Sequence, residues 1–227
     1  NVPLSKRVKL ILGNDEETAW RCVRHYFSVY PEAPVSGFIP DADFPLIYAE
    51  KGISCIFVDG KIDNDDLVEI KGGFRDNMVP DYASAILKPN KNYVEAFQAY
   101  LKKYNFEGQA ELKDGNVLLK VVGKSAHGST PQFGENAIDR LMAFFVEQEF
   151  SGNMVKAYEQ LLLNDFLGKK LGVDYVDEEM GELTNNVGVF TAEHGHYQIH
   201  LNLRYPNHVD FDQVVAKLEK EFKRYGA

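Results

Sequence analysis

The stretch QAELKDGNVLLKVVG, residues 109–123, predicts the type of sheet that most of the chain forms. Apolar and polar residues alternate on both sides of Asp114-Gly115, and this dipeptide favours a two-residue turn between antiparallel strands. A second hairpin is predicted around His194-Gly195, again between runs typical of strands. The sheet is therefore expected to be built from antiparallel hairpins.

Helices are predicted between and after these hairpins. Apolar residues recur at helical spacing in four segments: 92–104, 136–150, 154–171 and 211–224. Short alternating runs begin near Ile53, and a further strand is predicted at 83–87. The combination favours an α+β domain with helices on one face of an antiparallel sheet. We place the start of this domain near residue 53.

The first 52 residues have a pattern typical of an α/β domain. The run KLILG at 9–13 predicts a buried parallel strand, and a helix is predicted over 14–30, with Asn14 or Asp15 as its cap. A proline-rich loop follows, and then a possible strand at 46–49. Because the chain opens directly on a core strand, we expect it to be an internal piece of a longer protein.

Composition excludes several classes of partner. The formal net charge of the 227 residues is −9, which disfavours binding to nucleic-acid phosphate or to anionic lipid. No run of about 18 apolar residues suggests a membrane helix, and no targeting segment is recognised. The two cysteines, Cys22 and Cys55, form no CxxC pair, which suits a reducing cytoplasm.

Two acidic segments could take part in metal chemistry. Glu16 and Glu17 follow the first predicted strand, where one carboxylate could bind a metal and its neighbour could act as a general base. The alternative is that acids here stabilise the first turn of a helix. Asp41 and Asp43 lie between prolines in the loop PDADFP, residues 40–45, and could be rigid metal ligands or ordinary turn residues.

Two basic side chains are candidates for substrate contacts. His127 lies in GKSAHGSTPQFGENAI, residues 123–138, where it could donate a hydrogen bond to a developing oxyanion or be an ordinary loop residue. Arg204, on a strand of apolar residues, could bind a carboxylate or form a structural salt bridge. The nearby histidines are interpreted as non-catalytic: His194, His196, His200 and His208.

Taken together, six segments resemble one family. GNDEETAW, PDADFP, EKGI, NMVPDYA, GKSAHGSTPQFGENAI and LNLRYP occur in the order found in bacterial dipeptidase V. This is the Xaa-His, carnosinase-like branch of the di-zinc metallopeptidases of the aminoacylase and carboxypeptidase type. The resemblance covers nearly the whole chain. It implies that residues 1–52 are a remnant of the α/β catalytic domain and that residues 53–227 are a lid domain with ferredoxin-like elements.

The resemblance also implies roles for single residues. Glu16 matches the general base that takes a proton from the attacking water, and His127 matches the lid histidine that stabilises the oxyanion. Glu17 and Asp41 match zinc ligands, with Asp43 as a rival for the role of Asp41. Two lid residues match those that contact the substrate, at its carboxylate end: Asn77 and Arg204. The implied substrate is a dipeptide with a free N-terminus.

The family uses two zinc ions, or manganese or cobalt in their place, and it draws further ligands from an upstream His-x-Asp motif, a bridging aspartate and a downstream histidine. None of these has a match in this chain, so its metal site is expected to be incomplete and the chain inactive by itself. A monomer is expected. Two alternatives stay open: an N-acyl amino acid deacylase of the same superfamily, and a non-catalytic lid or dimerisation module.

Overall fold

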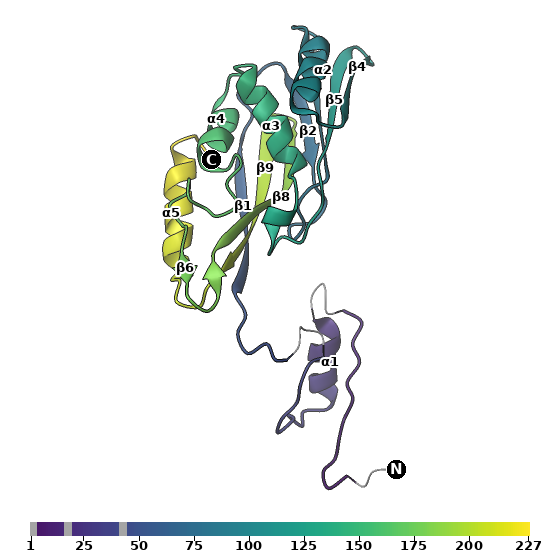
Figure 1. Ribbon diagram of the computed structural model, residues 1–227, viewed down its shortest axis with the longest axis vertical. Helices are drawn as coiled ribbons and strands as arrows, with labels where there is room; N and C mark the ends of the chain where they lie inside the picture. Colours follow the sequence, from purple (N-terminus) through teal and green to yellow (C-terminus); the bar gives the residue numbers. More distant parts are fainter. Residues whose placement is uncertain (1–3, 16–19, 41–44) are drawn as a thin grey trace. The chain divides into compact units, whose positions relative to one another are not determined.

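The computed structural model describes residues 4–15, 20–40 and 45–227. The chain forms two compact units, Asn1–Ile47 and Tyr48–Ala227 (Figure 1). No helix among the described residues is both long enough and apolar enough to cross a membrane.

The second unit is built on a seven-stranded sheet with the order β1-β9-β8-β2-β3-β5-β4, in which every neighbouring pair is antiparallel. Its strands are β1 (Gly52–Lys61), β2 (Leu67–Gly72), β3 (Tyr82–Leu87), β4 (Gly108–Lys113), β5 (Asn116–Val122), β8 (Thr184–Glu193) and β9 (His196–Tyr205). A separate two-stranded ribbon is formed by β6 (Val176–Asp177) and β7 (Gly181–Glu182). The helices are α2 (Tyr93–Tyr104), the short 3-10 helix η1 (Pro131–Phe133), α3 (Ala137–Glu147), α4 (Asn153–Leu161) and α5 (Phe211–Lys223).

Both predicted hairpins are present. Asp114 and Gly115 connect β4 to β5 with φ of 51° and 78°, and His194 and Gly195 connect β8 to β9 with φ of 52° and 80°. Two consecutive left-handed residues match the right-handed twist of antiparallel strands, which is why these turns favour glycine. The antiparallel sheet predicted from this pattern is therefore confirmed.

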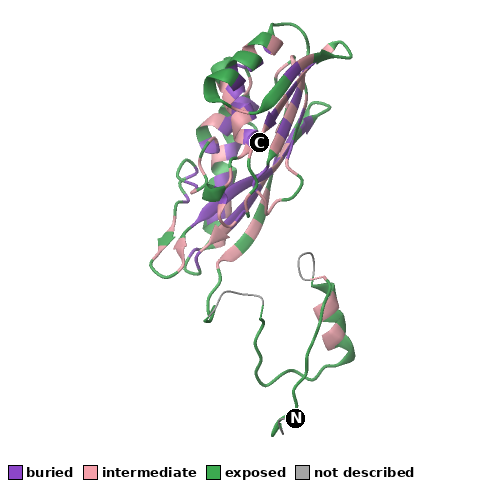
Figure 2. Ribbon diagram, turned by 45° about the vertical axis from the view of Figure 1, so that its right-hand side comes forward, coloured by how far each residue is buried: buried purple, intermediate pink, exposed green. Residues whose placement is uncertain are grey.

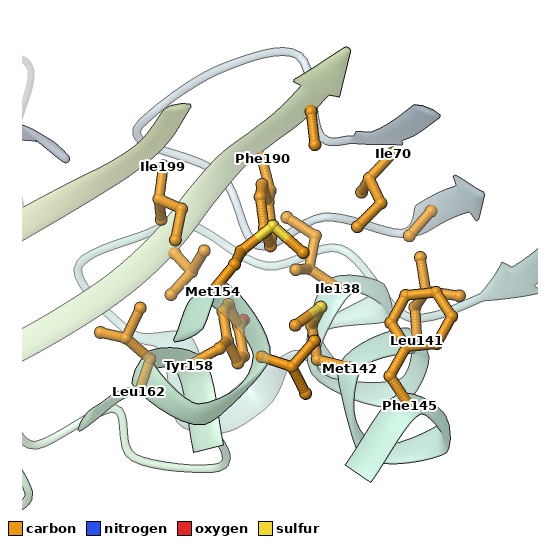
Figure 3. Close-up of a cluster of buried hydrophobic side chains, with 14 of the residues drawn as sticks. Ile70, Ile138, Leu141, Met142, Phe145, Met154, Tyr158, Leu162, Phe190 and Ile199 are labelled. Carbon is orange, nitrogen blue, oxygen red and sulfur yellow. The ribbon is translucent and has the colours of Figure 1, made fainter. Parts of the chain in front are cut away.

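One hydrophobic core lies between the sheet and the helices. Figure 2 shows the helices along one side of the sheet, with the buried residues between the two layers. Phe190 of β8 stacks on Tyr158 of α4 with ring centroids 5.8 Å apart, and Ile199 of β9 and Met154 pack around them (Figure 3). Alternate strand residues supply this layer because successive side chains point to opposite faces. The predicted α+β arrangement, with helices on one face, is confirmed.

The third predicted helix is shorter than expected. It was predicted over 154–171, but α4 ends at Leu161. The backbone N–H groups of Leu162 and Leu163 both donate to the carbonyl of Tyr158, and Asn164 then turns left-handed with φ of 56°. The apolar residues after Leu161 are in a compact turn, so their spacing alone did not indicate that the helix had ended.

The first unit contains α1 (Arg21–Val29), which begins later than the predicted helix. The carboxylate of Asp15 accepts a hydrogen bond from the backbone N–H of Arg21 at 2.9 Å. It thus pairs a backbone donor in the first turn of α1, although Asp15 lies outside the helix. The predicted strands at 9–13 and 46–49 are not formed, and their residues are exposed. A strand needs a hydrogen-bonded neighbour, and the described residues of this unit provide none.

Candidate functional site

The predicted site residues fall into two groups. Those predicted as general base and metal ligands lie outside the described residues: Glu16, Glu17, Asp41 and the rival Asp43. Those predicted to contact substrate or oxyanion are all described, and all lie in the second unit: Asn77, His127 and Arg204. The structure therefore shows the positions of the predicted substrate-contacting residues only.

Asn77 and His127 lie on adjacent backbone segments. The loop after β2 and the loop after β5 continue the β3–β5 pairing, and Met78 and His127 form an isolated antiparallel bridge. The N–H of Gly128 donates to the carbonyl of Asn77 at 2.7 Å, and the N–H of Val79 donates to the carbonyl of Ala126 at 2.8 Å. The main chain thus fixes the spacing between these two residues.

The hydrogen bonds of His127 define which ring nitrogen carries the proton. The backbone N–H of Ser129 donates to Nδ1 at 3.3 Å, and the Ser129 hydroxyl lies 2.6 Å from the same atom. Because a backbone N–H is always a donor, Nδ1 is the acceptor, and the neutral ring then carries its proton on Nε2. The side chain is exposed. His127 therefore presents an N–H donor that a substrate oxygen could accept.

Arg204 lies on the face of the sheet opposite the helices. Its neighbour Leu203 is buried in the core layer, so alternation along β9 directs Arg204 the other way. Its Nε donates to Oδ1 of Asn202 at 3.1 Å, and burial lowers the pKa of the guanidinium. Among the described residues no carboxylate pairs with it, so the structural salt bridge considered above is not found there. The terminal nitrogens are left to bind an anion.

Asn186 connects the three residues. It lies directly opposite Asn202 in the β8–β9 pairing, and Asn202 in turn accepts the hydrogen bond from Arg204. The Asn186 amide donates to the carbonyls of Asp76 and Met78 at 3.0 and 2.9 Å. Strand pairing and these hydrogen bonds therefore link Arg204 to the loop that carries Asn77, and main-chain bonds join that loop to the loop of His127.

The sequence analysis missed Asn186, although a signal for it exists. The segment LTNNVGVF places three consecutive polar residues in a strand that is otherwise apolar. The structure buries all three, and with Asn202 they are the four buried polar residues among those described: Thr184, Asn185, Asn186 and Asn202. Buried polar side chains are costly without partners, so such a run marks a functional or connecting role.

A cavity of about 600 Å³ opens beside α3. Its lining includes Asp139, Asn185 and Asn186, whereas His127 and Arg204 do not line it. The carboxylate of Asp139 accepts a hydrogen bond from the Tyr158 hydroxyl at 2.8 Å, and burial raises the pKa of this carboxyl to about 6. Both amide atoms of Asn185 are buried without a hydrogen-bond partner among the described residues.

Metal-binding side chains do not gather in the described part of the chain. No group of three or more His, Cys, Asp or Glu residues there could hold a metal ion. The two predicted ligands, Glu17 and Asp41, lie outside this part, so the predicted zinc site stays a prediction.

Comparison with known proteins identifies the class of this domain. Residues 115–227 match the family model of the M20 type that is described as the peptidase dimerisation domain. The antiparallel sheet with helices on one face agrees with this match. Residues 115–227 are therefore identified with this domain, and the family resemblance predicted from the motifs is confirmed.

Two relatives give a more specific comparison. A protein of Bacillus subtilis (strain 168) named "Putative dipeptidase YtjP" is 39% identical over 219 residues, which are 91% of this chain and 47% of the relative. A protein of Staphylococcus aureus (strain USA300), also named a "Putative dipeptidase", is 34% identical over 240 residues, covering 100% of this chain and 51% of the relative. The chain thus spans about half the length of the curated relatives it matches.

Proposed function

We propose that the full-length protein is a metal-dependent dipeptidase that cleaves dipeptides with a free N-terminus, of the Xaa-His type. In this proposal, residues 1–52 belong to the catalytic domain and residues 53–227 form the lid. The names of the relatives support a dipeptidase. The observation that carries the proposal is the set of hydrogen bonds and strand pairings that links Arg204 to the adjacent loops of Asn77 and His127.

Each described residue has a defined part in this proposal. Arg204 offers a half-buried guanidinium with no ion pair among the described residues, which suits the C-terminal carboxylate of a dipeptide. Asn77, whose loop is bonded to Asn186 of β8, would contribute its side-chain amide to the substrate. His127 donates its Nε2–H to the oxygen that gains negative charge when water attacks the peptide carbonyl, and closure of the lid would bring it to the reacting group.

The remaining roles fall on residues outside the described part. Glu16 would take the proton from the attacking water. Glu17 and Asp41, with Asp43 as the rival of Asp41, would hold metal together with ligands from elsewhere in the full-length protein. The two zinc ions, or manganese or cobalt, would supply Lewis-acid polarisation of the peptide carbonyl.

A monomer is part of the proposal. Apart from η1 before α3 and the β6–β7 ribbon before β8, the second unit contains two similar successions, α2-β4-β5-α3 and α4-β8-β9-α5, and both hairpins lie in the same sheet. One chain therefore already supplies two helix–hairpin–helix halves. A cytoplasmic location is also proposed, supported by the two free thiols of Cys22 and Cys55.

One alternative has an observation in its favour. The matching family model is described as a dimerisation domain, which supports a non-catalytic lid or dimerisation module. A deacylase of N-acyl amino acids would use Arg204 equally well, because its product also carries a carboxylate. Which substrates are cleaved, if any, distinguishes these functions.

The test is hydrolysis by the full-length protein loaded with zinc, wild type against Glu16→Ala. The substrates are Ala-His, β-Ala-His, Ala-Ala and N-acetyl-alanine. We expect cleavage of the dipeptides and a loss of several orders of magnitude in the variant. Cleavage of N-acetyl-alanine alone would establish the deacylase instead. No cleavage of any substrate by metal-loaded protein would favour the dimerisation module.

A further inference from the structure

We infer that Asn186, together with the pair formed by Asp76 and His200, positions Asn77 relative to Arg204. These three residues are assigned as positioning residues: they act on substrate through Asn77 and do not themselves contact it. The inference rests on the proposed function for its kinetic consequences, whereas its structural part stands independently.

The Asn186 amide binds the carbonyls of the two residues on either side of Asn77. Its Nδ2 donates to the carbonyl of Asp76 at 3.0 Å and to the carbonyl of Met78 at 2.9 Å. Asn186 is 2% exposed, so these bonds form away from water. A side chain that satisfies the carbonyl on either side of one residue restricts the rotation of that residue, and loss of the amide would leave both carbonyls without this partner.

A glycine allows the loop to approach β8 so closely. Gly188 lies at the irregularity in the β8–β9 pairing between Val187 and Val189. A Cβ atom at Gly188 would lie 2.3 Å from the carbonyl oxygen of Asp76, which is closer than real Cβ contacts. The bulge and the missing side chain therefore create the space in which the main chain of the loop packs against the strand.

The pair of Asp76 and His200 ties the same loop to β9. His200 Nδ1 lies 2.7 Å from Asp76 Oδ1, and its Nε2 lies 2.7 Å from Gln198 Oε1. The Gln198 amide nitrogen donates to Asp59 at 2.8 Å, which orients its oxygen toward the histidine. Asp76 and Gln198 thus hold the His200 ring from both sides.

Packing restricts the ring further. The rings of Phe57 from β1 and His200 pack edge to face, with centroids 4.6 Å apart and planes at 87°. His200 and Arg204 lie on the same strand and, being four residues apart, on the same face of the sheet. One strand thus carries both the carboxylate-binding arginine and an attachment point for the loop with Asn77. The distance between the two substrate-binding groups is set by this shared strand.

The structural part is tested by amide hydrogen exchange on the full-length protein. The reporters are the amides of Gly128 and Val79, whose hydrogen bonds join the Asn77 loop to the His127 loop. We expect faster exchange at both amides in Asn186→Ala, by about tenfold or more. Because a buried substitution could impair folding, Asp76→Ala is the second variant, since its side chain is 32% exposed. Unchanged exchange in both folded variants would overturn the inference.

The matched control uses the other histidine–aspartate pair. His208 Nδ1 lies 3.2 Å from Asp177 Oδ2, beyond the end of β9. His208→Gln should leave exchange at Gly128 and Val79 at the wild-type rate, whereas His200→Gln should raise it. Equal effects of the two substitutions would show a general loss of stability and would contradict a positioning role.

The kinetic part uses a double-mutant cycle on the best dipeptide substrate. We expect Asn186→Ala to raise KM and to lower kcat/KM by about 10- to 100-fold, because a small displacement of a binding group is costly. In the Asn77→Ala background the same substitution should cost less than about threefold, since its effect passes through Asn77. A full loss in that background would overturn the inference. If the wild type cleaves no dipeptide, the proposed function fails, and the exchange experiment still decides the positioning.

Discussion

The backbone nitrogen of Ser129 lies 3.3 Å from Nδ1 of His127, and this contact determines the chemistry available to the histidine. Because the N–H is a donor under all conditions, the neutral imidazole carries its proton on Nε2. A residue two positions along the same loop thereby orients the ring as an N–H donor. A carboxylate partner, which many catalytic histidines use for this purpose, is replaced here by the main chain.

The oxyanion role of His127 predicts a selective loss in kcat. His127→Ala in the full-length protein should lower kcat by about 100- to 1,000-fold with little change in KM, because the hydrogen bond strengthens as charge develops. Steady-state kinetics on a dipeptide measures both constants. Ser129→Ala keeps the backbone donor and should cost less than about tenfold. Equal losses in kcat for the two variants would contradict the assignment of the proton to Nε2.

The carboxylate role of Arg204 predicts a dependence on the substrate terminus. Arg204→Ala should lower kcat/KM for a free dipeptide by about 100-fold, since it removes a charge-assisted contact. The same variant should cleave the matching dipeptide amide as well as the wild type does, because that substrate has no carboxylate to bind. An equal loss on both substrates would show that Arg204 supports the structure and does not bind the substrate terminus.

The raised pKa of Asp139 predicts that stability depends on pH. In the folded protein this carboxyl keeps its proton up to a pKa of about 6, against an ordinary value of 3.8. Between these values the unfolded chain binds fewer protons, so stability falls as pH rises from about 4 to about 6 and stays lower above. Asp139→Asn removes this loss, and the variant should gain about 2 to 3 kcal/mol relative to wild type between pH 4 and pH 7.

Urea unfolding of both proteins at pH 4 and pH 7 checks this prediction, with the difference in unfolding free energy as the readout. The comparison cancels any fixed effect of the amide, including its altered hydrogen bond to Tyr158. A difference of the same size at both pH values would mean that Asp139 ionises normally in the folded protein.

The predicted incompleteness of the metal site concerns this chain by itself. Glu17 and Asp41 are only two predicted ligands, whereas a site for two zinc ions needs several more, so tight binding is not expected. An equilibrium zinc titration of residues 1–227 should show no pair of tight sites. Two tight sites would refute the prediction and would require ligands that the motifs do not identify.

The association state is predicted from the doubled helix–hairpin–helix arrangement. Because one chain already supplies two helix–hairpin–helix units to a single sheet, the full-length protein is expected to sediment as a monomer. Equilibrium sedimentation over a range of concentrations is the measurement. A stable dimer would support the dimerisation module that the family description suggests.

The local elements of the second unit could be predicted from short sequence signals. Asp114-Gly115 and His194-Gly195 specify hairpins because few residues tolerate two left-handed positions in succession. Asn92 and Asn136 begin helices because their side chains accept backbone N–H groups that the helix leaves unpaired. These signals act over a few residues, so they can be recognised without knowledge of the fold.

Features that depend on residues far apart in the chain could be recognised only in the folded structure. The strand predicted at 9–13 needs a hydrogen-bonded neighbour that the described residues do not provide. Helix α4 ends because Leu162 and Leu163 both donate to the carbonyl of Tyr158 and Asn164 turns left-handed. The role of Asn186 depends on Asp76 and Met78, more than 100 residues away in the chain. Hydrogen-bond geometry between such partners is set by the packing of whole strands, which no local pattern encodes.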